Sequence, residues 1–162
     1  MENRTKKIIF LAIFILSLAA VWGQSFVSMQ DSEAVSDFFV DKIQPLEEIK
    51  PDPDSEYITE EYDFLNHLVR KGAHVFEFTV IGAEMMILAL TFKRRRYRML
   101  ILAMNSCMAG VLIGLIDETI QIFSERGTKV SDVWFDALGT LIGVVAVMVL
   151  ARIKMKKARA NR

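Results

Sequence analysis

Four long apolar stretches constrain this chain more than any other feature of its sequence. A helix needs roughly 20 consecutive apolar residues to cross the hydrocarbon core of a bilayer. Stretches of this kind occupy residues 8–27, 69–92, 99–123 and 130–151, and hydrophobic residues make up 52% of the 162-residue chain. We therefore predict an all-α integral membrane protein with four transmembrane helices.

The first stretch also has features of a secretory signal peptide, because basic residues precede its apolar core and Gly23 is a small residue near its end. Trp22, however, stands at the expected cleavage site, where small residues are preferred, and the apolar run is long enough to span the bilayer. We favour an uncleaved membrane anchor formed by residues 1–28.

Charge is strongly segregated along the chain, although its formal net charge is zero. Residues 29–68 contain twelve Asp and Glu against two Lys, whereas residues 93–98 are KRRRYR and the tail from Ala151 carries six Lys and Arg and no acid. Cytoplasmic loops of membrane proteins are enriched in Lys and Arg. We expect both termini and residues 93–98 to be cytoplasmic, and the acidic segment to face outside. No nucleic-acid-binding motif is present, so the basic blocks are interpreted as cytoplasmic anchors.

The segment between the first two stretches, residues 29–58, is predicted to form an acidic extracytoplasmic loop. Apolar residues within 35–43 have an amphipathic pattern, which favours a short helix on the membrane surface, and the KPDPD stretch at residues 50–54 favours an extended or turn conformation.

The second membrane helix is predicted to begin at Thr59, outside the bilayer. Glu60 and Glu61 follow this hydroxyl residue, and a hydroxyl cap followed by acids suits a helix N-terminus. A three-helix membrane core then spans residues 59–152, and residues 153–162 form a basic cytoplasmic tail.

Ionisable residues recur along one face of each of the last three stretches. Ionisable groups within a span are costly, so they normally face the protein interior or an aqueous cavity and mark function. Because a helix advances 100° per residue, side chains three, four or seven residues apart share a face. The residues on these polar faces are Arg70, His74, Glu77 and Glu84 in the second stretch, Asp117, Glu118 and Gln121 in the third, and Asp132 and Asp136 in the fourth.

The predicted topology places these polar faces at one depth, at the outer-leaflet end of the last three helices. The second helix enters from outside, the third returns there, and the fourth begins there after a turn that contains Arg126. We expect one shared pocket with Arg70 and Arg126 at its rim. Lys71 falls beside the polar face and is interpreted as an interfacial lysine with its ammonium in water. Purely structural hydrogen bonding between helices is the alternative for the whole cluster.

Spaced small residues predict close contact between helices. Gly110 and Gly114 in the third stretch, and Gly139 and Gly143 in the fourth, have the GxxxG spacing that lets membrane helices approach each other. Cys107 is the only cysteine, so an intrachain disulfide is excluded, and we interpret it as a packing residue.

The segments RKGAHVFEF, DETIQIF and RGTKVSDVWFDALGTLIG resemble the VanZ-like membrane proteins of bacteria, over about residues 66–143. Phe78 stands where that family has Tyr, and Asp136 stands where it commonly has Asn. The resemblance implies a multi-pass protein of the bacterial cell membrane, with an effect on susceptibility to the glycopeptide teicoplanin, to which the founding member is linked. The matching residues are His74, Glu77, Glu118, Gln121, Arg126 and Asp132.

Three functions fit these residues. In the first, the pocket binds an amphiphilic or lipid-linked molecule, such as a cell-wall precursor or a lipoglycopeptide, and Arg70 and Arg126 contact its anionic headgroup. In the second, His74 and the carboxylates serve an intramembrane enzyme by acid–base or metal chemistry on a lipid-linked substrate. A single His lacks the specificity of an HExxH helix, so no metal-ligand set and no cofactor are assigned. The third, a proton-coupled carrier built around Glu84, would need a homo-oligomer because four spans are few.

Overall fold

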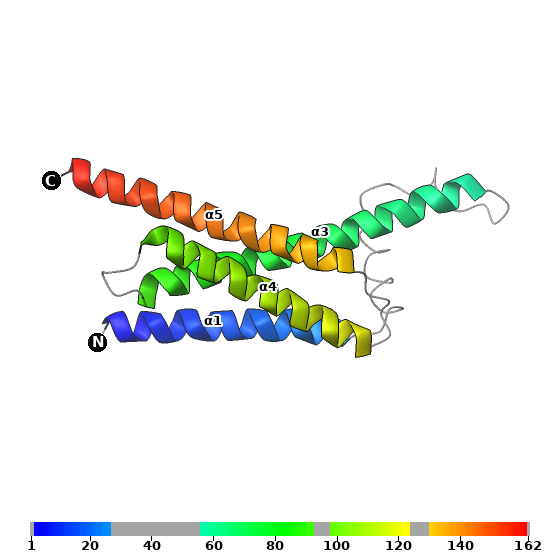
Figure 1. Ribbon diagram of the computed structural model, residues 1–162, viewed down its shortest axis with the longest axis horizontal. Helices are drawn as coiled ribbons and strands as arrows, with labels where there is room; N and C mark the ends of the chain where they lie inside the picture. The colour runs from blue at the N-terminus through cyan, green and yellow to red at the C-terminus, as the bar shows by residue number, and fades with distance from the viewer. Residues whose placement is uncertain (1, 27–55, 93–97, 124–129, 162) are drawn as a thin grey trace.

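The computed structural model describes residues 2–26, 56–92, 98–123 and 130–161. These residues form four helices, α1 (Glu2–Ser25), α3 (Glu56–Phe92), α4 (Met99–Phe123) and α5 (Val130–Ala160) (Figure 1). Each of the four is long and apolar enough to cross a membrane. The all-α class and the four spans are therefore confirmed for the described part of the chain. The expected surface helix at residues 35–43 and the turn that contains Arg126 lie outside it.

The helices extend beyond the apolar stretches that predicted them. α3 begins at Glu56, so Thr59 lies within its first turn and its predicted place at the start of the helix is wrong. α5 continues to Ala160, nine residues past the predicted span (160 − 151), with Lys157 and Arg159 in its last turn. Lys, Arg, Met and Ala are strong helix formers, and cations are favourable at a helix C-terminus. Hydropathy predicts the part of a helix that lies in the hydrocarbon core. It does not predict the helical turns that continue beyond the core into water.

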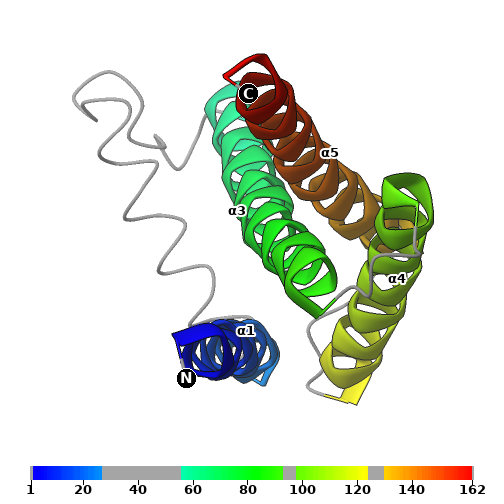
Figure 2. The same cartoon turned by 90° about the vertical axis from the view of Figure 1, so that its left-hand side faces the viewer.

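Helices that follow each other along the chain alternate in direction, in the way that four crossings require. Lys7 near the start of α1 lies over the ring of Phe92 at the end of α3, with its Nζ 5.1 Å from the ring centroid. α1 is therefore antiparallel to α3. α3 and α5 run in the same direction and make the most extensive contact in the bundle. Both chain ends lie at the same end of the bundle (Figure 1), and Figure 2 shows α3 and α5 side by side from that end.

The outer surface of the bundle is apolar and its interior is rich in small and polar residues. Leu16, Phe76, Met108 and Leu141 are among many large apolar side chains that point outward, whereas buried positions include serine, threonine and aspartate. This distribution suits a lipid surround, in which apolar side chains face the hydrocarbon and polar groups need partners within the protein.

Glycines bring α3, α4 and α5 into close contact. A Cβ atom at Gly143 would collide with the carbonyl oxygen of Thr79 and the amide nitrogen of Ala83 on α3. A Cβ at Gly139 would meet the carbonyl oxygen of Val75, one turn earlier on α3. Gly110 on α4 faces the side chain of Thr140 in the same way. The backbones of α3 and α5 therefore approach each other where α5 carries glycine.

Replacing Gly143 by Ala is expected to lower the free energy of unfolding by about 1–3 kcal/mol, because overpacking against backbone atoms forces the helices apart. Gly72→Ala is the matched control on α3, since no atom lies within 4 Å of the added Cβ. Alanine is favoured over glycine in a helix interior by about 0.5–1 kcal/mol, so this control should be neutral or stabilising. Thermal unfolding in detergent measures both, and equal losses in the two variants would contradict the assigned packing.

Candidate functional site

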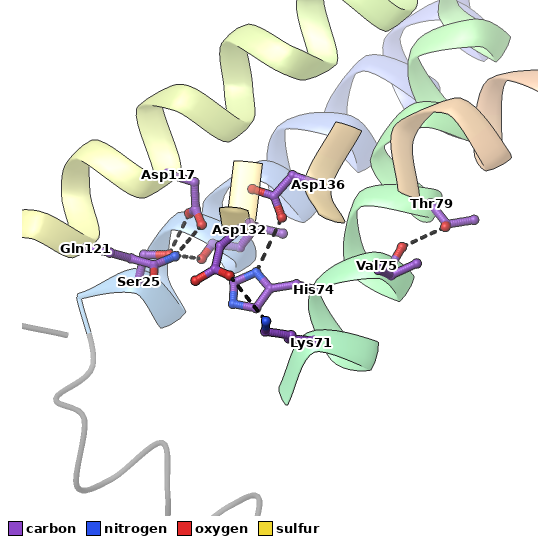
Figure 3. A network of polar contacts seen from close by, with 10 residues as sticks. Ser25, Lys71, His74, Val75, Thr79, Asp117, Gln121, Asp132 and Asp136 are labelled. Atoms are coloured by element: carbon purple, nitrogen blue, oxygen red, sulfur yellow. Dashed lines mark hydrogen bonds and ion pairs between the residues drawn. The ribbon is translucent and has the colours of Figure 1, made fainter. Parts of the chain in front are cut away.

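A cluster of polar side chains from α1, α4 and α5 is buried along α4 (Figure 3). Asp117 and Asp136 are fully buried, and Glu118 is only 6% exposed. α3 borders the cluster through His74, which is half-buried. The buried members are Ser25 of α1, Asp117, Glu118 and Gln121 of α4, and Asp136 of α5.

Asp117 is held in place by two hydrogen bonds. The Ser25 hydroxyl at the end of α1 donates to its Oδ1 at 2.5 Å, and the Gln121 amide one turn later on α4 donates to its Oδ2 at 2.7 Å. Hydrogen bonds to a carboxylate are stronger than those between neutral groups. These contacts fix the orientation of Asp117 and fasten the end of α1 to α4.

Three carboxyl groups converge from two helices. One oxygen each from Asp117, Glu118 and Asp136 lie within 4.8 Å of one another. Asp136 crosses from α5, and neither of its carboxyl oxygens has a hydrogen-bond partner among the described residues. Like charges this close in a buried site cannot all be ionised without a compensating cation.

Two basic side chains of α3, His74 and Lys71, lie beside this cluster. His74 Nδ1 lies 3.6 Å from Asp136 Oδ1. One turn earlier, Lys71 Nζ lies 4.0 Å from Asp132 Oδ1 and 4.7 Å from the centroid of the Phe135 ring. Lys71, interpreted from the sequence as an interfacial lysine beside the polar face, therefore also contacts α5.

The other predicted site residues lie at different distances from this centre. Glu77 is half-buried, one turn after His74 on α3. Arg70 is half-buried, and no hydrogen bond or ion pair links it to a carboxylate that the structure describes. Arg126 is outside the described residues, so its expected place at the rim remains a prediction.

Glu84 forms a separate polar contact deeper in the bundle. The Ser17 hydroxyl of α1 donates to its Oε1 at 2.9 Å, while its Oε2 is buried without a hydrogen-bond partner among the described residues. Glu84 follows His74 by ten residues, about 15 Å along α3. It is therefore not part of the carboxylate cluster.

An apolar groove lies between α1, α3 and α4, with a volume of about 460 Å³. It begins at Ile113, one turn from Asp117, and follows α4 away from the cluster to Asn105. Asn105 and Ser106 are its only polar lining residues. The lining is completed by Phe14 of α1, Met85, Leu88 and Ala89 of α3, and Ala109 and Leu112 of α4.

The VanZ/LLP1 family model matches residues 8–151. The chain belongs to the VanZ/LLP1 family. This confirms the resemblance, and the match is longer than the predicted range of about 66–143, because it includes the first helix and the acidic segment. Neither the curated proteins nor the solved structures contain a match to the chain. Together with the four spanning helices, the family identifies a multi-pass membrane protein and is consistent with a bacterial origin.

Phe78, which replaces the tyrosine expected from the VanZ resemblance, is fully buried beneath the cluster. It packs in an apolar core with Val21 of α1 and Ile81 of α3, and lies against Gly114 and Gly139. An apolar environment leaves no need for a hydroxyl group. In this VanZ-family protein the residue supports the floor of the cluster.

Two buried polar residues were not predicted from the sequence: Ser25 in the cluster, and Thr140, which lies against Gly82 and Gly110. Serine and threonine in membrane helices commonly bond to their own backbone, as Thr79 does to the Val75 carbonyl at 2.7 Å. Ser25 contacts the Val21 carbonyl in this way, at 3.2 Å, and also reaches Asp117. The spacing of Thr140, four residues after Asp136, is the one signal that could have indicated its place.

Proposed function

We propose that this VanZ-family protein binds a single amphiphilic or lipid-linked molecule, with its headgroup at the polar cluster and its hydrocarbon tail in the apolar groove. The observation that carries the proposal is that the two features lie one helical turn apart along α4. The groove starts at Ile113, and Asp117 lies one turn further on. From Ile113 to Asn105 the groove runs for about 12 Å, at 1.5 Å per residue. A polar site next to an apolar groove matches the two halves of a lipid.

The cluster belongs, on this proposal, in the outer leaflet, with both termini in the cytoplasm. The described residues at the end of the bundle that holds both termini are strongly basic, which supports this orientation under the positive-inside rule. Those basic residues are Arg4, Lys6 and Lys7 of α1, and Arg152, Lys154, Lys156, Lys157 and Arg159 of α5.

Single cysteines in a variant that lacks Cys107 test this orientation. Cysteines placed within the acidic segment at residues 29–58 are expected to react with an impermeant thiol reagent on intact cells, whereas one at Arg95 should react only after the membrane is opened. Peptide mass analysis of the labelled protein gives the result. Labelling of the Arg95 position alone on intact cells would reverse the topology and move the cluster to the inner leaflet.

Obstruction of the groove tests the proposed ligand site itself. Ala109 lines the groove, so Ala109→Trp is expected to fill it and remove lipid that copurifies with the protein in mild detergent. Met104→Trp on the same helix is the matched control, because Met104 is 57% exposed and lies outside the groove lining. Native mass spectrometry compares the bound lipid in the two variants. Equal retention in both would contradict the groove as the site of the tail.

An intramembrane enzyme that acts on a lipid-linked substrate is the second candidate, supported by the 3.6 Å approach of His74 Nδ1 to Asp136 Oδ1. A histidine next to a carboxyl group can exchange a proton with a bound substrate. Conversion of a lipid-linked wall precursor by the purified protein, and its loss in His74→Ala, would favour this candidate. Saturable binding of the same precursor without any product would favour a binding protein.

A further inference from the structure

One face of α5 is exposed from its first turns to its basic end. The opposite face carries Gly139 and Gly143, which contact α3. Since the described helices leave the exposed face uncovered, it faces the hydrocarbon of the bilayer. The large side chains on this face are Trp134, Leu138, Leu141, Val145 and Val149.

Trp134 and Arg152 mark the two ends of this apolar face. They are separated by 18 residues (152 − 134), about five complete helical turns, so both side chains leave the helix in the same direction, about 27 Å apart. The hydrocarbon core of a bilayer is about 30 Å thick, and Trp is enriched where the core meets the headgroups. With Trp134 at one interface, Arg152 therefore reaches the other.

Two more cations continue this face beyond Arg152. Lys156 and Arg159 follow it by four and seven residues, which places all three within an arc of about 60° around the helix. All three are exposed, and the last turns of α5 extend past the ends of α3 and α4 (Figure 1). The apolar face therefore ends in three cations at the level of the lipid headgroups, in the leaflet opposite to the polar cluster.

Two further lysines of the same segment point the other way. Lys154 and Lys157 lie about 140–160° around the helix from Arg152, on the side of α5 that carries Gly139 and Gly143. A lipid whose tails cover the exposed face has its phosphate beside Arg152 and not beside these lysines. The basic segment therefore contains its own comparison between the two faces.

We propose that Arg152, Lys156 and Arg159 bind the headgroup of an anionic phospholipid, whose tails lie along the apolar face from Val149 toward Leu141. Guanidinium groups form paired hydrogen bonds to phosphate oxygens, and clusters of Lys and Arg next to a membrane helix bind anionic lipids. This lipid lies on the outer face of α5, whereas the groove of the proposed function lies between α1, α3 and α4. Neither site depends on the other.

Competition between two lipids for the purified full-length chain tests the site. Delipidated protein in a maltoside detergent is mixed with equal amounts of phosphatidylglycerol and phosphatidylcholine that have the same acyl chains, and native mass spectrometry gives the ratio of the two bound lipids. The unaltered chain is expected to prefer phosphatidylglycerol. A basic residue near an anionic membrane surface strengthens association roughly fivefold, so the double variant Arg152→Gln/Lys156→Gln should lower the ratio by roughly fivefold or more.

The matched control is Lys154→Gln/Lys157→Gln, which removes the same number of charges from the other face and should keep the ratio of the unaltered chain. The groove is the same in all three proteins, so a lipid bound there does not affect the comparison. The four substituted residues are exposed, and thermal unfolding in detergent is expected to be unchanged. If the first double variant does not fold, Lys156→Gln/Arg159→Gln decides the outcome.

No preference for phosphatidylglycerol in the unaltered chain would overturn the proposal. An equal fall of the ratio in both double variants would also overturn it, because that result indicates attraction to the net charge of the segment instead of recognition on one face. Displacement of the lipid by inorganic phosphate at constant ionic strength would identify a site for a soluble anion and would contradict the assignment to a phospholipid.

Discussion

Replacement of Asp136 by Asn is expected to raise the free energy of unfolding by about 1 kcal/mol or more, because one of three buried carboxyl groups whose oxygens lie within 4.8 Å of one another loses its charge. The carboxyl oxygens of Asp136 have no hydrogen-bond donor among the described residues and face those of Asp117 and Glu118. An amide of the same size removes one charge and adds an N–H donor toward its neighbours. Unfolding by titration with a denaturing detergent measures the change.

Asp117→Ala is the matched comparison within the cluster, and it should act in the opposite direction. Asp117 accepts hydrogen bonds from Ser25 and Gln121, so its removal deletes two buried hydrogen bonds to a carboxyl group. Hydrogen bonds to a charged group contribute about 1.5–3 kcal/mol each. A fall in stability for both variants would contradict the view that Asp136 repels the neighbouring carboxyl groups. A stability cost at a functional residue is common, because binding sites hold groups that only the ligand satisfies.

Expression of this protein in a susceptible Gram-positive host is expected to raise tolerance to teicoplanin at least severalfold, with little change for vancomycin. Teicoplanin carries a fatty acyl tail and vancomycin does not. Each buried methylene contributes about 0.8 kcal/mol, so the tail favours residence in the outer leaflet, where the proposed pocket opens. Minimum inhibitory concentrations of the two drugs give the result.

His74→Ala and Glu118→Ala should abolish this difference while the amount of protein in the membrane is unchanged. Met104→Ala, at a position that faces outward from α4, should retain it. Equal protection against both drugs would indicate a general effect on the cell wall. No protection, with the protein present in the membrane, would remove the resistance role and leave the family assignment intact.

The four spans were predictable because hydropathy and charge asymmetry report directly on the bilayer. The length of the apolar run at residues 99–123 gives the bounds of α4 as the structure has them. The ends of α3 and α5 were not predictable in this way, because their terminal turns lie beyond the apolar run and depend on helix propensity.

The choice among neighbouring polar residues required the packed structure. At 100° per residue, Arg70 lies about 40° and Lys71 about 60° from His74 around the helix axis, so the pattern hardly separates them. The packing of α3 against α5 brings the Lys71 ammonium close to Asp132. Convergence of Asp117 and Asp136 likewise depends on the close approach that Gly114 permits, where an added Cβ would lie 3.1 Å from Asp136. The groove depends on small residues such as Ala109 and on the position of α1, which spacing does not give.

A structure determined with native lipids retained tests the central claim most directly. The proposal predicts density for one hydrocarbon tail along α4 from Ile113 toward Asn105, continuous with a headgroup at Asp117, Glu118 and Asp136. A groove filled by protein side chains, or a groove lipid with its headgroup at the opposite, basic end of the bundle, would contradict it.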